Sequence, residues 1–441
     1  MKHYPQRVKE TLMNLIDEMS QYSWLFSKTP ERDFTRKRKL DFEKTVMSIL
    51  NLGSRSISNE LLDCFKCPAR LPSASAFVQQ RSKLPSSTME FLFREFTETS
   101  GPNELYRGYR LMAVDGSDLQ IATNSGDADS YFPGTEGQKP FNLLHLNAIY
   151  DLRSHLYVDV IVEGKHVSNE HKTFTAMVDR SKISSAIVVA DRGYESYNNM
   201  AHVQEKGWKF LLRVRDSAYG IVSGLKLPDT DVFDMPVNLL LTRKQTNEAK
   251  ELHKDRNRYR LIPSRRTFDY LPQCSKKSIP MKPYELFFRV VRFKISANTY
   301  ETIVTNLDRD FFSPSELKNI YAMRWGIETS FRDLKYTVGL LHFHAKKVEY
   351  ILQEIFARLI MYNFSELITS QVLIQKKNRK YAYKANFSAA VHICRQFFRG
   401  NVSPPIVEAL IARFLLPVRP GRCRSRKATA KAAISFVYRV A

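Results

Sequence analysis

Apolar positions recur at helical spacing through the first hundred residues of the chain. The pattern runs through VKETLMNLIDEMSQYSWLF, then DFEKTVMSILNLG, then ISNELLDCF, and Ser56 stands where it can cap the third segment. The spacing predicts a helical N-terminal region over residues 1–105. Its basic stretches, including ERDFTRKRKL, are typical either of solvated helix faces or of a surface that contacts DNA.

The pattern changes to strands at residue 106. YRLMAVDGSDLQIA, FNLLHLNAIYDL and HLYVDVIVEG follow one another closely, which favours an antiparallel meander. A helix (NEHKTFTAMVDRS), a fully apolar strand (AIVVA), a second helix (YNNMAHVQEKG) and a strand (WKFLLRV) come next. This order predicts an α/β, RNase H-like core, a mixed five-stranded sheet with flanking helices, over residues 106–215 and 313–375.

Two further regions complete the predicted organisation. Within residues 216–312, apolar and polar positions alternate in YELFFRVVRFKI and ETIVTNL, which predicts a β-rich insertion. A helix over about 314–336 follows, opened by Ser313 and Pro314, and apolar helices extend it. Residues 376–441 carry two basic blocks and predict a basic helical C-terminal region.

Charge narrows the class of partner. The 441 residues include 68 Lys and Arg against 45 Asp and Glu, a formal charge of +23, which favours a polyanionic partner, with nucleic acid ahead of a membrane surface. No apolar run is long enough to span a bilayer, and the N-terminus lacks a signal-peptide pattern. Five scattered cysteines argue against a disulfide framework, so we expect a cytoplasmic protein.

Two aspartates stand where apolar strands end. Asp115 follows Met-Ala-Val and precedes Gly116, and Asp191 follows Val-Val-Ala and precedes Arg192 and Gly193. Each alone is typical of a turn. As a pair in this strand order they favour a metal site, because carboxylates at such positions are costly to bury without a cation.

The predicted helix at 314–336 supplies a third acid. At 100° per residue, one stripe about 60° wide holds four chemically distinct side chains: Tyr321, Arg324, Glu328 and Lys335. Apolar residues from Ile320 to Leu334 cluster on a neighbouring flank and predict the core-facing side. An intrahelical pair between Arg324 and Glu328 is the simpler explanation for two of the four.

Three acids from separate elements suit phosphodiester chemistry. Two divalent ions about 3.5–4 Å apart neutralise the attacking and leaving oxygens and are held by carboxylates. Mg²⁺ prefers such hard oxygen ligands. Arginine and lysine beside the acids position DNA through its phosphates without reading its sequence.

The spacing Y-x2-R-x3-E-x6-K resembles the signature of the DDE transposases of bacterial insertion sequences, the IS-four family. DGS at 115–117 and ADRGY at 190–194 resemble the first and second acidic motifs of that family. The resemblance implies that Asp115, Asp191 and Glu328 bind two Mg²⁺, with Mn²⁺ as a substitute. It also implies that Tyr321, Arg324 and Lys335 contact phosphates at the transposon end.

Two further residues beside these motifs are DNA-contact candidates. Trp325 can stack on DNA or pack under the insertion, and Arg192 can hold a phosphate or pair with a neighbouring carboxylate. Asp118, three residues after Asp115, is predicted to be a surface or turn acid.

The resemblance implies a DNA transposase that binds the terminal inverted repeats of its element. It would nick the DNA, use the released 3′-OH for strand transfer into target DNA, and form a hairpin during cut-and-paste movement. We expect a homodimer on double-stranded DNA, no membrane partner, and a bacterial cytoplasmic protein associated with the nucleoid when bound. A metal-dependent nuclease on the same fold and a non-catalytic DNA-binding derivative are the alternatives.

Overall fold

The computed structural model describes residues 3–36, 38–66, 71–101, 104–135, 137, 139–215, 220–272, 282–374 and 381–419. Cys67, Cys274, Cys423 and most of the two basic C-terminal blocks lie outside these residues. Within them, Cys64 and Cys394 are free thiols. No helix among the described residues is long and apolar enough to cross a membrane.

One mixed sheet of ten strands runs through the middle of the molecule, in the order β2-β3-β1-β5-β6-β10-β9-β7-β8, with β4 also paired to β3. Its strands are β1 (Arg110–Ile121), β2 (Tyr131–Phe132), β3 (Phe141–Asp151), β4 (Tyr157–Gly164), β5 (Ala186–Ala190), β6 (Lys209–Arg213), β7 (Phe233–Thr242), β8 (Tyr259–Leu261), β9 (Tyr284–Ser296) and β10 (Thr299–Thr305).

The central strands follow the predicted order of elements. β1 pairs antiparallel with β3, and β3 pairs antiparallel with β4, so the expected meander is confirmed. All five residues of β5 are buried, and this strand pairs in parallel with both β1 and β6. Helices α6 (Glu170–Arg180) and α7 (Tyr197–Glu205) connect these strands.

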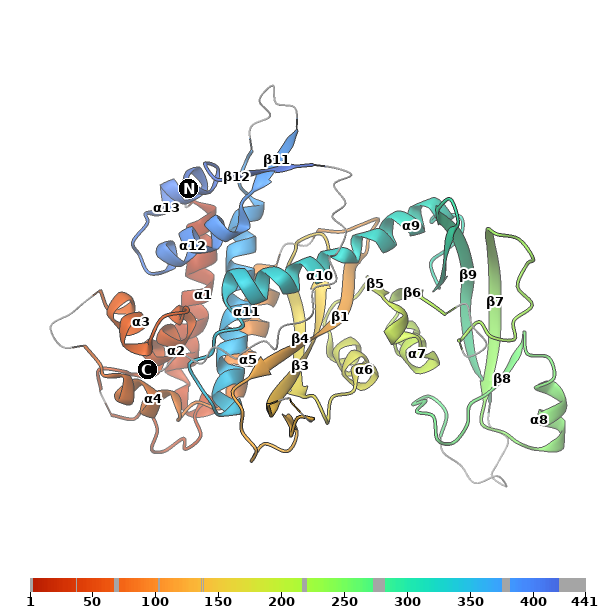
Figure 1. Cartoon of the computed structure of the whole chain (residues 1–441), viewed down its shortest axis with the longest axis horizontal. Coiled ribbons are helices and arrows are strands. Elements are labelled where there is room, and N and C mark those ends of the chain that lie inside the picture. The colour runs from red at the N-terminus through yellow and green to blue at the C-terminus, as the bar shows by residue number, and fades with distance from the viewer. Residues whose placement is uncertain are drawn as a thin grey trace.

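The prediction of a five-stranded sheet was wrong, because the sheet has ten strands. The residues expected as an insertion contain β7, β8, β9 and β10 together with α8 (Asn247–Leu252). They are β-rich as predicted, but β10 pairs antiparallel with β6, so their strands continue the central sheet (Figure 1). The cause is the free edge of β6, whose backbone groups need a partner strand.

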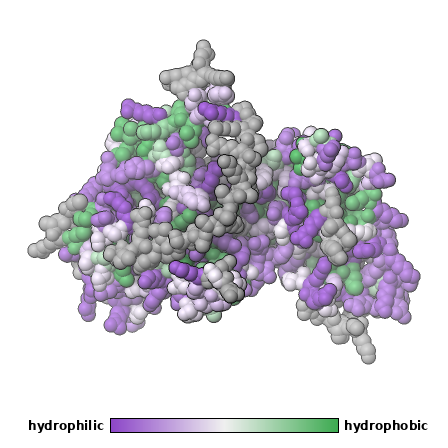
Figure 2. Space-filling model, viewed as in Figure 1, coloured by the Kyte–Doolittle hydropathy of each residue, from purple (hydrophilic) through white to green (hydrophobic). Residues whose placement is uncertain are grey.

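Helices from both ends of the chain pack together at the other end of the molecule (Figure 1). The N-terminal ones are α1 (Tyr4–Gln21), η1 (Ser23–Phe26), α2 (Phe42–Asn51), α3 (Ile57–Cys64), α4 (Ala74–Arg81) and α5 (Ser86–Ser100). The C-terminal elements are α11 (Val348–Ser370), β11 (Ala382–Ala385), α12 (Phe387–Phe398), α13 (Pro404–Ile411) and β12 (Leu415–Val418). Hydrophilic residues cover most of the face shown in Figure 2.

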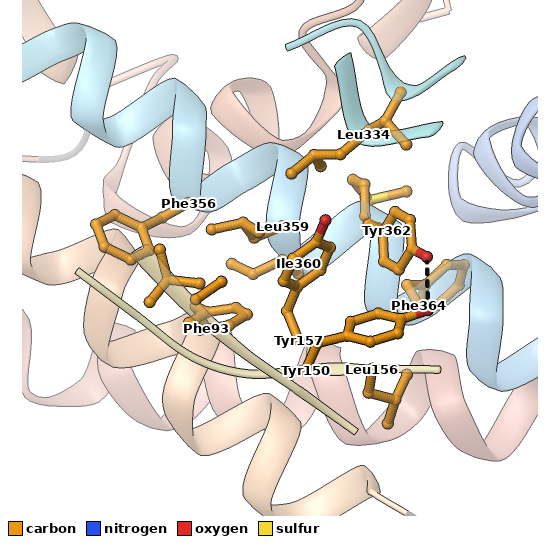
Figure 3. Packing of buried hydrophobic residues seen from close by; sticks show 14 of the residues in the cluster. Phe93, Tyr150, Leu156, Tyr157, Leu334, Phe356, Leu359, Ile360, Tyr362 and Phe364 are labelled. Carbon is orange, nitrogen blue, oxygen red and sulfur yellow. Dashed lines mark hydrogen bonds between the residues drawn. The ribbon is translucent and has the colours of Figure 1, made fainter. Parts of the chain in front are cut away.

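Helix α11 is the centre of this helical region and is buried along almost its whole length. It carries Phe356, Leu359, Ile360 and Tyr362 into a core shared with the sheet (Figure 3). The hydroxyl groups of Tyr362 and Tyr150, the latter on β3, lie 3.2 Å apart. A helix that is apolar on every side must be enclosed by other elements, and segments from both chain ends therefore surround α11.

The predicted helix at 314–336 is present but is divided. It consists of α9 (Pro314–Met323), α10 (Trp325–Arg332) and a π-helical turn, η3 (Asp333–Val338). Ser313 caps its start by accepting a hydrogen bond from the Glu316 N–H group. The division falls at Arg324, and the π-helical turn changes the angular positions that uniform helical spacing predicts beyond Arg332.

Candidate active site

Asp115 and Asp191 lie side by side at the same level of the sheet. The parallel ladder between β1 and β5 pairs Ala113 with Val189, and both aspartates come two residues later. β1 continues beyond this point, paired only with β3, whereas β5 ends at Ala190. The prediction of adjacent strands is therefore confirmed, although Asp115 lies within β1 and not at its end.

Both aspartates face the side of the sheet that α9 and α10 cover. Side chains alternate along a strand, and Ala113 belongs to the same core cluster as Val189 and Ile327. Asp115 and Asp191 follow these two strand residues by two positions and so point the same way. A Cβ added to Gly326 of α10 would lie 3.0 Å from the Leu152 side chain, so glycine lets the helix approach closely.

Arg324 stands between the acid of the helix and the acid of β1. Its Nη2 donates to Oε1 of Glu328 at 2.8 Å, and its Nη1 lies 4.0 Å from Oδ2 of Asp115. The guanidinium carbon also lies 5.7 Å from the centre of the Tyr321 ring and 5.3 Å from that of Trp325. The arginine is 6% exposed, so the pairing is formed largely away from solvent.

The three carboxylates influence one another electrostatically. Burial, with smaller contributions from the nearby Asp191 and Glu328, raises the pKa of Asp115 to about 6 against the opposing effects of the Gly116 N–H group and Arg324. The Gly116 N–H group donates to Oδ1 of Asp115 at 2.8 Å. A negative charge at Asp115 is therefore unfavourable in this surrounding, the condition that a bound cation relieves.

The chemistry of the donors fits a divalent metal, but their present arrangement does not yet hold one. All three are hard oxygen ligands of the kind that Mg²⁺ takes. Among the described residues, no three His, Cys, Asp or Glu side chains are grouped closely enough to bind a metal ion. The guanidinium of Arg324 lies between Glu328 and Asp115, so the acids converge only after it moves.

The stripe of four residues lies beside the sheet and is only partly open to solvent. Tyr321 and Arg324 are each 6% exposed, because this side of the helix packs on the sheet. The alternative of an intrahelical pair between Arg324 and Glu328 is the arrangement found. Lys335 is half-buried and donates from Nζ to the Asp118 carbonyl at 2.8 Å.

Two other predicted DNA contacts face solvent. Trp325 is 55% exposed, and Arg192 is exposed in η2 (Arg192–Tyr194), directly after Asp191. The Gly193 N–H group donates to Oδ1 of Asp191 at 2.7 Å, which fixes the direction of that carboxylate. The contacts of Trp325 and Arg192 with DNA stay predictions.

A charged cluster on the opposite face of β1 was missed by the sequence interpretation. His145 on β3 lies opposite Asp118 and contacts its Oδ1 at 2.5 Å, and it lies 3.1 Å from Oε1 of Glu170. Burial lowers the pKa of His145, but its two carboxylate partners outweigh this and raise it to about 9. Asp118 is exposed, so its prediction as a surface acid is confirmed, but it is also paired: its pKa is lowered to about 2 by His145 and Lys165.

A second missed pair lies on the insertion side. Arg213 of β6 contacts Oε1 of Glu301 on β10 with its Nε at 3.0 Å. Burial raises the pKa of Glu301, while Arg213, Arg324 and Arg192 lower it. The only sequence signal for either cluster is a charged residue inside an apolar strand, which does not identify its partner.

Comparison with known proteins shows the family. A family model described as a transposase DDE domain matches residues 106–364, more than half of the chain. The chain is similar to the transposase InsG for insertion sequence element IS4 of Escherichia coli (strain K12), with 22% identity over 344 residues that cover 74% of this chain and 70% of the relative.

Among solved structures, the chain is similar to the piggyBac transposase synaptic complex with hairpin DNA, at a TM-score of 0.40 and 11% identity over 95% of this chain and 87% of that one. The matched family region begins just before β1 and ends within α11, so it contains Asp115, Asp191 and Glu328. This chain belongs to the transposase DDE domain family, whose activity is DNA cleavage and transposition.

Proposed function

We propose that this protein is the DNA transposase of a bacterial insertion sequence, with an RNase H-like catalytic core and membership of the IS-four family. One observation carries the proposal. Asp115 and Asp191 lie at one level of adjacent parallel strands, and Glu328 comes from the helix that covers the same face. Three carboxylates from three elements are the ligand set that two-metal phosphodiester chemistry uses.

Asp115, Asp191 and Glu328 would hold two Mg²⁺, with Mn²⁺ as a substitute. When bound, the ions supply charge neutralisation and an activated oxygen nucleophile for attack on phosphorus. The contribution of the chain itself is to orient these carboxylates: backbone N–H groups donate to Asp115 and Asp191. Arg324 holds Glu328 until a phosphate takes its place, after which Glu328 can join the other two acids.

Cations and aromatic groups around the acids would bind the DNA. Lys335, Arg324 and Arg192 would contact phosphates, and the exposed Trp325 would stack on a base. Tyr321 is buried, so its contact with DNA requires the helix to shift. Arg324 can exchange Glu328 for a phosphate, because both offer oxygens to a planar guanidinium.

The reaction would proceed from terminal inverted repeats to target DNA. A strand is nicked to release a 3′-OH, which then serves as the nucleophile in strand transfer; cut-and-paste movement through a hairpin on the transposon end is the expected course. A homodimer on double-stranded DNA would hold the two ends. The cellular place that fits such a partner is the bacterial nucleoid.

A cleavage and joining assay tests this function. The substrate is labelled duplex DNA from the sequence that flanks the gene, with Mg²⁺, Mn²⁺ or EDTA. We expect nicking and strand transfer with either metal, none in EDTA, and none for Asp115→Ala, Asp191→Ala or Glu328→Ala. Hydrolysis without joining would establish the nuclease alternative, and binding without cleavage by the unaltered chain would establish the non-catalytic one.

A further inference from the structure

A polar cavity of about 800 Å³ lies in the helical region, between the end of α3 and helix α12. Figure 1 places these elements at the end of the molecule away from the insertion strands. The cavity shares no lining residue with the acid site; it is lined by Gly53, Ser54, Arg55, Glu60, Leu62, Asp63, Lys66, His392, Arg395, Gln396, Arg399 and Asn401.

Some of the cations in this wall serve the fold. Arg399 donates from Nη1 to Asp63 at 3.0 Å and from Nη2 to Glu60 at 3.0 Å, which ties α12 to α3. Arg55 also pairs with Asp63. The two acids of the cavity are therefore already engaged, and the remaining cations of the wall are Arg395 and Lys66.

Arg395 forms no ion pair with an acid of the described residues. Its Nη2 donates to the Val338 carbonyl at 2.8 Å, but its Nε is buried and has no hydrogen-bond partner among the described residues. Burial, together with the neighbouring Arg358 and Arg399 and against the opposing charge of Glu60, lowers the pKa of Arg395 to about 9. A buried arginine among like charges is stabilised when an anion enters.

Lys66 adds a second unpaired cation at the rim. It is exposed, and the structure records no ion pair for it among the described residues. Burial lowers the pKa of the neighbouring Lys9, and the charge of Lys66 contributes to that lowering. His392, Gln396 and Asn401 add polar groups to the same wall, so the cavity offers both charge and hydrogen bonding to an oxyanion.

We propose that this cavity between α3 and α12 binds a phosphate of the DNA backbone, at a site separate from the three acids, with Arg395 and Lys66 as its ligands. The inference rests on the proposed function, which supplies DNA as the partner. DNA is favoured over a small anion because the chain carries a formal charge of +23, and phosphates along a duplex neutralise several of its cations together.

The site is also connected to the catalytic helix. Val338, whose carbonyl Arg395 holds, is the last residue of η3, which continues the helix that carries Glu328. DNA anchored at Arg395 therefore restrains the far end of that helix.

The test measures affinity for a duplex of arbitrary sequence by fluorescence anisotropy in EDTA, at several salt concentrations. The variants are Lys66→Ala and Arg395→Gln, with Lys250→Ala, an exposed lysine of α8, as the matched control. We expect each cavity variant to weaken binding about 3- to 10-fold and to reduce the slope of log affinity against log salt by about one, as one lost phosphate contact does. Lys250→Ala should leave both unchanged, and Arg395→Lys should retain most of the slope.

Wild-type affinity and slope in Lys66→Ala would overturn the inference, even if Arg395→Gln proves unstable by thermal unfolding. Inorganic phosphate that binds wild-type protein, together with unchanged DNA binding by Lys66→Ala, would show a small-anion site and would also overturn it. Mg²⁺-dependent cleavage by the wild-type chain keeps the proposed function in either case. Failure of the wild-type chain to bind or cleave DNA rejects the proposed function itself.

Discussion

Nη2 of Arg324 donates a 2.8 Å hydrogen bond to Oε1 of Glu328, one helical turn further along the chain. The same guanidinium reaches to within 4.0 Å of Asp115. A single arginine therefore contacts the acid of the helix and lies close to the acid of β1. Under the proposed function, a phosphate that binds this arginine would leave both carboxylates available to a metal.

Glu328→Gln separates binding from chemistry. Loss of the carboxylate removes a negative charge beside the DNA phosphates and weakens the hold on Arg324. We expect affinity for DNA to stay equal or rise, while nicking falls by at least about 100-fold, because a hard oxygen ligand is lost. Parallel anisotropy and cleavage assays measure the two effects, with Glu408→Gln on α13 as the control. Normal cleavage by Glu328→Gln would remove Glu328 from the site.

Asp115→Asn should stabilise the fold at neutral pH. The folded-state pKa of about 6 lies above the usual value of 3.8, so the favourable contribution of this group is present at low pH and is lost as pH rises from about 4 to 6. The amide removes this loss, and the free energy of unfolding at pH 7 should rise by about 1–3 kcal/mol.

Urea unfolding at pH 4, 5, 6 and 7 measures this change. The curves of wild type and Asp115→Asn should diverge as pH rises, whereas Asp229→Asn, at an exposed loop position, should follow wild type. A variant less stable than wild type at pH 7 would contradict the electrostatic explanation.

Gly116→Ala should damage both stability and cleavage. An added Cβ would lie 2.6 Å from Nε2 of His145 and 3.2 Å from Oδ1 of Asn147. His145 is held between Asp118 and Glu170, so it cannot move aside freely. We expect a loss of about 1–3 kcal/mol in the free energy of unfolding and slower nicking, because Asp115 is the preceding residue.

Gly126→Ala is the control for this substitution, since the nearest atom to its added Cβ is a side-chain oxygen at 3.3 Å. Thermal unfolding and nicking rates are compared for the two variants. Equal stability and nicking rates in the two variants would mean that the His145 side chain moves aside without cost.

Arg81→Ala tests the connection between α4 and α11. Arg81 and Glu354 are 2% and 1% exposed, and Nη1 of the arginine donates to Oε1 of the glutamate at 3.0 Å. Removal of Arg81 leaves the buried Glu354 with His344 as its remaining contact, and breaking a buried ion pair in this way costs about 3–5 kcal/mol. Gln79→Ala, an exposed neighbour on α4, should change the unfolding midpoint little in the same urea titration. A small effect of Arg81→Ala would show that water reaches Glu354.

Local patterns predicted the elements well because period and caps act within a few residues. The alternation of apolar and polar residues in FNLLHLNAIYDL and the apolar run AIVVA each predicted a strand that is present. The positions of Asp115 and Asp191 at apolar strand segments made them candidates for the site. Helical spacing also predicted the core side of Ile320 and Ile327. What it could not predict is how much of the adjacent flank the sheet covers, and Tyr321 and Arg324 on that flank are each 6% exposed.

The features that were missed depend on pairings between distant segments. The register of β1 and β3 brings His145 next to Asp118, and the pairing of β6 with β10 brings Arg213 next to Glu301. The same long-range pairing makes the sheet ten strands wide. A single sequence gives no register between strands, so these contacts could not be derived from it.

The place of β10 along the chain also sets an order of synthesis. During synthesis, Asp115 and Asp191 emerge early, on strands that pair with each other directly. Glu328 is synthesised after β10, because α9 begins at Pro314 and β10 ends at Thr305. A growing chain therefore carries two of the three acids before the third, and the strands that join the sheet at β6 are made between them.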